Sequence, residues 1–244
     1  MTAPKSAIIA QLQKDILPLQ GFKKNRNSTI LDLNLGPVKN AFPNAQFPIG
    51  AVHEFCYTGA EDAAATSGFV SGVLASLMRT GGVSIWISAD RMIFPPALQS
   101  FGIAPDKIIF IDLQKESDIE WAMEEALKCN GLAAVVGEMP ELSFTASRRL
   151  QLAVEQSQVT GFILRRNPRS LSTTACVTRW KITSIPTILA DDMPGVGFPC
   201  WKVELLKVRN GKPGTWQIEF AAGKFRHLPP AIILDVQEPQ KKTG

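Results

Sequence analysis

The sequence predicts an α/β fold in which a mostly parallel, twisted sheet is flanked by helices and ends in antiparallel strands. Short apolar runs bounded by glycine and proline recur along the chain, and stretches of helical periodicity separate them. Strands that alternate with such helices form βαβ units with parallel pairing and right-handed crossovers. In the last third, the segment RNGKPG at 209–214 joins two strand-like runs without a helix, which is typical of an antiparallel hairpin.

The chain is expected to divide into three regions. Residues 1–47 would form an N-terminal helix and a linker, 48–228 the core, and 229–244 a polar tail. Apolar residues at helical spacing over 4–17 predict an amphipathic helix, which packs either on its own core or on a neighbouring subunit. The second arrangement would make a homo-oligomer. A short alternating strand is expected at 29–33.

The first part of the core is predicted to alternate strand with helix. The first long helix should end at the pair Gly81-Gly82, and Pro95 opens a short helix. Ser117 and Glu120 form a capping box, which predicts the start of another helix. The apolar runs between helices are typical of strands buried on both faces. The expected strands are 51–56, 83–88, 107–112, 132–136 and 161–164, and the expected helices are about 62–80, 95–101, 117–128 and 145–157.

The remainder of the core departs from this alternation. Alternating or apolar runs predict strands at 175–184, 201–208 and 215–220, and the hairpin segment joins the last two. The strand at 161–164 is therefore expected to be the last parallel one. A mixed sheet with an antiparallel edge follows.

Composition narrows the classes of function. The 244 residues are 45% hydrophobic and 20% charged, and no apolar run approaches a membrane span, so we expect a cytoplasmic protein with no membrane contact. Lys14 and Asp15 interrupt the region where a signal peptide keeps its apolar run. The four cysteines form no C-x-x-C pair and there are only two histidines, so neither a disulfide framework nor a metal site is expected.

The junction at 49–69 has the strand, turn and helix of a phosphate-binding loop but lacks its key residues. If Gly59 opens the motif G-x-x-x-x-G-K-[ST] and Thr66 closes it, the second glycine is Ala64 and the lysine is Ala65. Alanine supplies no positive charge and disfavours positive φ. We therefore expect a vestigial phosphate loop, no bound cofactor and no catalytic residue.

A basic segment from Arg165 to Lys181 is the best candidate for contact with single-stranded DNA. It contains five basic residues and no acidic one. Basic side chains neutralise phosphates, and hydroxyl groups donate hydrogen bonds to them. The alternative is an ordinary surface loop whose arginines pair with acidic residues, with Trp180 in the core. The candidate DNA-binding residues are Arg165, Arg166, Arg169, Arg179 and Lys181.

Five short motifs occur in this order along the core: FPPA at 94–97, WAMEEAL at 121–127, RRLQLA at 148–153, TRWK at 178–181 and Trp201 before ELL at 204–206. The order of the predicted elements resembles the ATPase core of RecA, and these motifs resemble the ImuA family of RecA-like accessory proteins in damage-induced mutagenesis. In the RecA pattern, Gly137 occupies the place of a magnesium-binding aspartate, Glu138 would point elsewhere, and Asp90 matches the residue that activates water. The resemblance therefore implies a RecA-like core without ATP hydrolysis.

The resemblance implies a non-catalytic adaptor in error-prone translesion DNA synthesis, within the SOS response to DNA damage. Its implied partners are ImuB, an error-prone replicative-type DNA polymerase and RecA. Two alternatives stay open. One is an ATP-dependent DNA-binding repair ATPase, and the other is an inhibitor of cell division like SulA, which shares this degraded fold.

Overall fold

The structure is a computed structural model. The predicted N-terminal helix and the first short strand lie outside the described residues, apart from Gln11 and Leu33, and so does the tail beyond residue 229. The described residues are 11, 33, 35–79, 81–168, 171–187 and 197–229.

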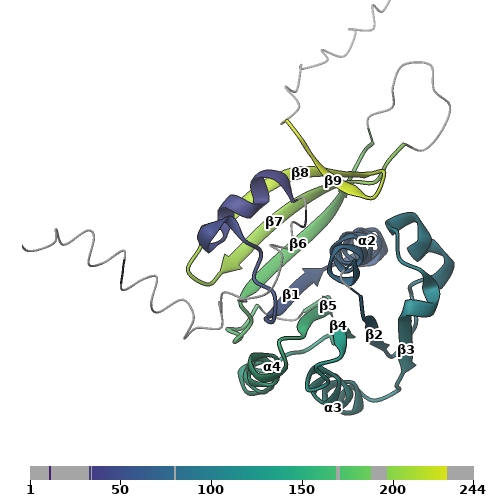
Figure 1. The fold of residues 1–244 in the computed structure, drawn as a ribbon, viewed down its shortest axis with the longest axis vertical. Helices are drawn as coiled ribbons and strands as arrows, with labels where there is room; N and C mark the ends of the chain where they lie inside the picture. The colour runs from purple at the N-terminus through teal and green to yellow at the C-terminus, as the bar shows by residue number, and fades with distance from the viewer. Residues whose placement is uncertain are drawn as a thin grey trace, which may run out of the picture.

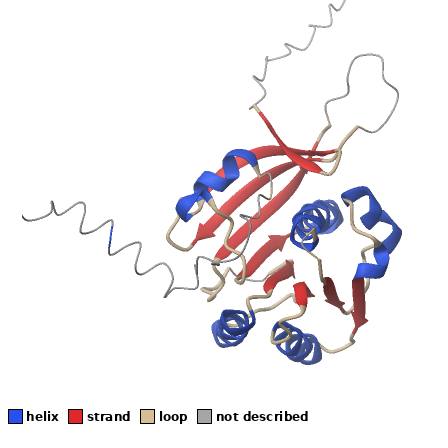
Figure 2. Cartoon of the chain, viewed as in Figure 1, coloured by secondary structure: helices blue, strands red, loops and turns tan. Residues whose placement is uncertain are grey.

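Within these ranges, nine strands form one mixed sheet in the order β3-β2-β4-β5-β1-β6-β7-β8-β9 (Figures 1 and 2). All pairings from β3 across to β6 are parallel, and those from β6 to β9 are antiparallel. This confirms the predicted fold class, although the last parallel strand is β6 rather than β5. The strands are β1 (Val52–Tyr57), β2 (Val83–Ser88), β3 (Ile108–Asp112), β4 (Leu132–Glu138), β5 (Thr160–Arg166), β6 (Thr178–Ile185), β7 (Cys200–Val208), β8 (Gly214–Ala221) and β9 (Lys224–Leu228).

Helices cover both faces of the parallel half of the sheet. Figure 1 shows α3 and α4 on one face and α2 with η3 on the other. Each face has its own apolar cluster, one centred on Met123 and Leu150 and one on Phe69 and Trp180. Burial of these clusters supplies the main driving force for packing the layers. The helices are α2 (Gly59–Met78), α3 (Glu116–Leu127) and α4 (Phe144–Ser157), with the 3₁₀ helices η1 (Gly36–Ala41), η2 (Pro43–Ala45), η3 (Pro95–Phe101) and η4 (Pro105–Lys107).

The antiparallel strands fold against α2 because two glycines of that helix leave room for aromatic rings. A Cβ at Gly68 would lie 3.1 Å from the ring of Trp201. A Cβ at Gly72 would lie 2.6 Å from the ring of Phe225 and 2.9 Å from that of Phe220. The glycines therefore set how closely the C-terminal strands approach the helix.

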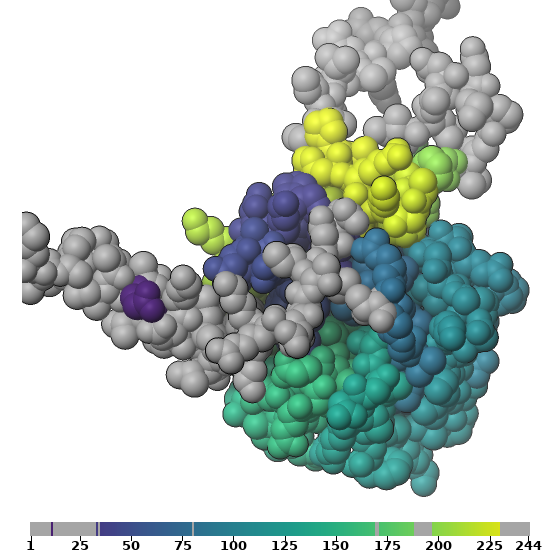
Figure 3. Space-filling model, in the orientation of Figure 1, coloured from purple at the N-terminus to yellow at the C-terminus, as the bar shows by residue number. Residues whose placement is uncertain are grey.

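The segment 35–47 belongs to the packed core, although the sequence predicted a linker there. Val38 is fully buried, and the ring centroid of Phe42 lies 5.9 Å from that of Trp180. The backbone N–H of Lys212, in the β7–β8 turn, donates to the carbonyl of Ala41 at 2.9 Å. Figure 3 shows this segment, in dark blue, lying beside the C-terminal strands in yellow. The core therefore starts well before residue 48.

Local predictions failed at two points. The capping box at Ser117 is wrong, because the N-cap of α3 is Lys115 and the Ser117 hydroxyl donates to Asp118 instead. Strand β9 was not predicted, because its sequence KFRHL is polar and pairs only along β8 at the edge of the sheet. A turn with positive φ at Ala222 (50°) and Gly223 (72°) makes that pairing possible.

Candidate functional site

A cavity of about 620 Å³ lies at the carboxyl ends of the parallel strands, against α2 and η3. Open α/β sheets place their ligand sites at this edge. Tyr57, Asp90, Glu138 and Arg166 line it from the ends of β1, β2, β4 and β5. The cavity therefore occupies the place where a nucleotide would bind, and its chemistry decides what it can hold.

No separate phosphate-binding loop connects β1 to α2. β1 ends at Tyr57 and α2 begins at Gly59, so only the N-cap Thr58 lies between them. Gly59 has a φ of +75°, a backbone conformation that the sharp turn needs and that glycine adopts without strain. The predicted loop positions up to Thr66 are helical, and beyond the first turn their backbone N–H groups bond within the helix. Only the first turn of α2 remains free to meet an anion.

The remaining positions of the motif do not present phosphate-binding groups. Ala64 lines the cavity, whereas Ala65 is buried in the core. Thr66 is fully buried, and its hydroxyl has no hydrogen-bond partner among the described residues. Glu61 and Asp62 add negative charge to the first turn of the helix. This arrangement suits the helix dipole but opposes a phosphate group.

Glu138, rather than Gly137, faces the cavity. A Cβ at Gly137 would lie 2.5 Å from the sulfur of Met123, in the apolar layer under α3. Glu138 instead accepts a hydrogen bond from Trp86 Nε1 at 2.7 Å and lines the cavity together with Asp90. The prediction that Glu138 points away from the site was wrong, because strand alternation turns residue 137 away and residue 138 inward.

The cavity favours cations over anions. Among its described lining residues, three are carboxylates (Asp90, Glu116 and Glu138) and one is basic (Arg166). Burial raises the pKa of the Glu138 carboxyl above its usual value, and the charge of Asp90 adds to the rise. The Trp86 hydrogen bond and Arg166 offset part of this shift. A phosphate placed here would meet further repulsion.

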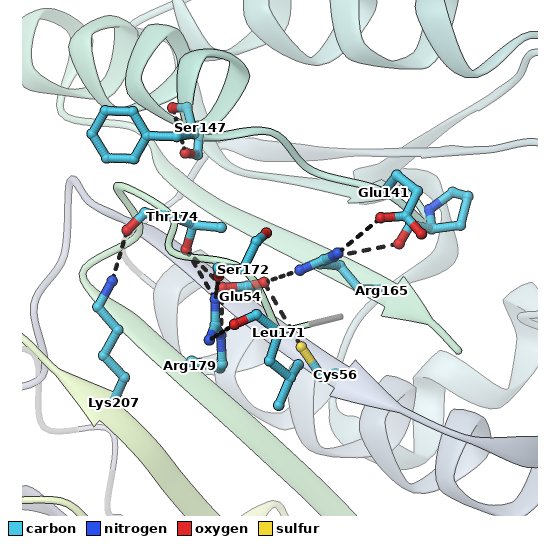
Figure 4. A network of polar contacts seen from close by, with 12 residues as sticks. Glu54, Cys56, Glu141, Ser147, Arg165, Leu171, Ser172, Thr174, Arg179 and Lys207 are labelled. Atoms are coloured by element: carbon cyan, nitrogen blue, oxygen red, sulfur yellow. Dashed lines mark hydrogen bonds and ion pairs between the residues drawn. The ribbon is translucent and has the colours of Figure 1, made fainter. Parts of the chain in front are cut away.

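Two of the predicted DNA-binding arginines lie in a buried ion-pair network (Figure 4). Glu54, in the central strand β1, accepts hydrogen bonds from Arg165 Nη1 at 2.6 Å, Arg179 Nε at 2.9 Å and the Thr174 hydroxyl at 2.8 Å. Glu54 and Arg165 are fully buried, and Arg179 is 8% exposed. Burial would raise the pKa of Glu54, but the hydrogen bonds from Arg165 and Arg179 hold it below its usual value.

The network also holds residues 171–174, which precede β6. Arg179 Nη1 and Nη2 donate to the carbonyls of Leu171 and Ser172, respectively, and Lys207 Nζ donates to the carbonyl of Thr174 at 2.7 Å. A charged residue in a buried strand must be paired. Glu54, a charged residue within the strand VHEFCY, is thus the sequence feature from which buried basic partners could have been predicted. We did not predict them.

The prediction of an exposed basic loop was therefore wrong for Arg165 and Arg179. Trp180 is fully buried, which agrees with the alternative prediction that it belongs to the core. Arg166 is exposed at the end of β5, and Lys181 is partly exposed in β6. Arg169 lies outside the described residues. DNA binding through Arg166, Arg169 and Lys181 stays a prediction.

A second buried polar chain runs beside the first on β1. Trp180 Nε1 donates to the Thr178 hydroxyl at 2.6 Å, and that hydroxyl lies 2.7 Å from His53 Nδ1. His53 Nε2 lies 2.8 Å from the carbonyl oxygen of Pro48, which can only accept, so the proton belongs on Nε2. Burial lowers the pKa of His53 to about 3, which keeps the ring neutral. His53 therefore has a structural role.

The described ranges contain neither a cluster of metal-binding side chains nor a helix that could cross a membrane. No three histidine, cysteine, aspartate or glutamate side chains in that part of the chain gather as a metal site. None of its helices combines the length and apolarity that a membrane crossing requires.

Comparisons with known proteins complete the assignment, although no family model matches the chain. A solved KaiC-like protein from Pyrococcus horikoshii shares the fold, with a TM-score of 0.52 and 13% identity over 76% of this chain and 93% of the other. The cell division inhibitor SulA of Photorhabdus laumondii is 28% identical over 123 residues, 49% of this chain and 70% of the inhibitor. The protein ImuA of two Caulobacter vibrioides strains is 33% identical over 202 residues, which covers 78% of this chain and 83% of ImuA. At this identity and coverage, the chain belongs to the ImuA family.

Proposed function

We propose that this protein is a non-catalytic RecA-like adaptor in damage-induced mutagenesis and that it acts in error-prone translesion DNA synthesis. Membership of the ImuA family supports the pathway. The observation that carries the non-catalytic role is the start of α2 directly after β1, with Ala65 buried at the lysine position.

The charges and the side chains at the cavity argue against phosphoryl transfer. That reaction depends on a lysine, a metal ion and convergent N–H groups that stabilise charge on the phosphate. Here the lysine is replaced by alanine, the hydroxyl of Thr66 is buried, and carboxylates outnumber the one basic group of the lining. The protein would then act by binding other macromolecules.

ATP turnover in the presence of single-stranded DNA and ImuB tests this proposal. We expect no turnover above that of a protein-free control. Turnover that is lost on Thr66→Ala would contradict the proposal and support an ATP-dependent DNA-binding repair ATPase.

The proposed partners are ImuB, an error-prone replicative-type DNA polymerase and RecA, with single-stranded DNA as a further ligand. Five basic residues were predicted to bind DNA. Two of them, Arg166 and Lys181, are at least partly exposed, which supports their proposed contact with DNA. Replacing both by alanine should weaken binding to an oligonucleotide and flatten the salt dependence of log K by about 1.4, from about 0.7 per lost phosphate contact. An unchanged slope would remove these residues from the DNA-binding surface.

A SulA-like inhibitor of cell division is the second candidate, because 123 residues align with that inhibitor at 28% identity. Light scattering by the polymerising tubulin-like division protein separates the two functions. We expect polymerisation to proceed unchanged at equimolar concentrations of this protein. Inhibition would favour the SulA-like function.

A further inference from the structure

We propose that the cavity at the carboxyl ends of the strands receives a basic, apolar peptide segment of a protein partner. The inference rests on the proposed non-catalytic function, because a bound nucleotide would fill the same space. Three independent features of the described residues support it: the charge of the cavity, a buried hydroxyl without a partner, and an exposed apolar rim.

The charge of the cavity selects a cation. Asp90 and Glu138 line the same wall, and their mutual repulsion destabilises the two charges together. Glu116 adds a third carboxylate, against the single basic group of Arg166. A lysine or arginine side chain of a partner would pair with the carboxylates, whereas an acidic side chain would be repelled.

An unpartnered hydroxyl lies in the cavity wall. Ser71 lines the cavity, is 1% exposed, and its Oγ has no hydrogen-bond partner among the described residues. Buried polar groups in folded proteins are nearly always hydrogen-bonded. A hydroxyl both donates and accepts, so a backbone amide or carbonyl group of a peptide would satisfy it.

The rim points to an occupant larger than the cavity. Met92 and Phe94 line the cavity and are 65% and 68% exposed. Both lie on the connection between β2 and η3, and Leu98 and Phe101 of η3 also line the cavity. Aromatic residues carry much of the binding energy in protein interfaces, and methionine adapts to varied partners. A small ligand confined to the cavity would leave this rim unused, whereas a peptide would cover it.

Three fluorescein-labelled heptapeptides test the proposal by fluorescence anisotropy with the full-length protein. Their sequences are GLFRFLG, GLFQFLG and GLFEFLG, so they differ only in the central residue, which is basic, neutral or acidic. We expect affinity to fall in the order arginine, glutamine, glutamate, with about a tenfold difference between the extremes at low salt. Equal affinities, or no binding by any peptide, would overturn the proposal.

Matched variants locate the binding. The double variant Asp90→Asn and Glu138→Gln keeps side-chain shape and should abolish the preference for arginine over glutamate. Phe94→Ala should weaken all three peptides several-fold. Phe144→Ala removes another exposed ring, 56% exposed, from α4 on the opposite face of the sheet (Figure 1) and should change nothing. Equal weakening by Phe94→Ala and Phe144→Ala would place binding outside the cavity and refute the site.

Nucleotide binding separates the failure of this inference from the failure of the proposed function. If neither the peptides nor Mg-ATP bind, the docking site is refuted while the non-catalytic role stands. If the peptides bind and Mg-ATP binds and is hydrolysed, the docking site stands and the non-catalytic role fails.

Discussion

Glu54 couples the central strand to two arginines from different strands, and its carboxylate is the shared acceptor of the buried network. Arg165 comes from β5 and Arg179 from β6, so the pairing links three adjacent strands of the sheet. A buried ion pair adds little net stability over apolar packing, but removing one partner leaves the others unpaired. The network therefore makes the sheet sensitive to a single residue.

We predict that Glu54→Gln lowers the free energy of unfolding by about 3–5 kcal/mol, because two buried guanidinium groups lose the buried carboxylate that they share. Urea unfolding followed by circular dichroism measures this change. Glu141→Gln is the matched control, since Glu141 also pairs with Arg165, at 3.4 Å, but has a side chain that is 49% exposed. It should cost no more than about 1 kcal/mol. Equal costs for the two variants would refute the network's role.

We predict that the protein loses stability in mild acid because His53 is buried in its neutral form. Its pKa is lowered to about 3 in the folded protein from 6.5, so the unfolded chain binds the additional proton as pH falls below 6.5. The free energy of unfolding should then fall by about 1.4 kcal/mol per pH unit once the unfolded histidine is protonated. The pKa of Glu54 is lowered from 4.5 in the folded protein, so the stability that its ionised form contributes is fully present above pH 4.5.

The difference between the wild type and His53→Gln isolates this effect between pH 6.5 and 4.5, because groups such as Glu138, which titrate in the opposite sense, contribute to both proteins. We expect the stability advantage of the wild type to shrink steadily as the pH falls. A difference that does not change with pH would show that His53 is not held neutral.

Helix α2 connects the two halves of the sheet. One side of it packs on the parallel strands, and its glycines admit the rings of β7, β8 and β9. Its N-terminus also forms one wall of the cavity, through Gly59, Ala60 and Ala63. The position of this helix therefore depends on contacts between residues that are far apart in the sequence.

We predict that Gly72→Ala destabilises the protein although alanine favours helices. The helix preference contributes about 1 kcal/mol, but the new Cβ would meet Phe225 at 2.6 Å, and overpacking costs about 1–3 kcal/mol. Thermal unfolding measures the net effect. Gly131→Ala is the control, because a Cβ there meets nothing within 4 Å. A melting temperature that is raised by Gly72→Ala would contradict this packing.

At the level of elements, the sequence predicted what depends on local pattern. The strand at Val83–Ser88 has the predicted bounds, since an apolar run between glycine and a polar turn is self-contained. Strand β9, the packed segment 35–47 and the inward direction of Glu138 depend on distant partners, so periodicity could not reveal them. The burial of Arg165 was open to prediction only through its distant partner Glu54.

The whole molecule combines a RecA-like sheet with a cavity whose charge is opposite to that of a phosphate site. Arg165 and Arg179 are paired with Glu54 in the buried ion-pair network rather than exposed to a ligand such as DNA. Carboxylates line the cavity where a nucleotide would bind. Family membership and this chemistry support the proposed adaptor. We propose that its cavity does not bind ATP.

Thermal melting of the purified protein with and without a large excess of Mg-ATP tests that claim most directly, because a ligand that binds only the native state raises the melting temperature. We expect no shift for the wild type and for Thr66→Ala alike. A rise of several degrees in the wild type that disappears in Thr66→Ala would contradict it, since the turn at Gly59 and helix α2 would then bind phosphate without a lysine.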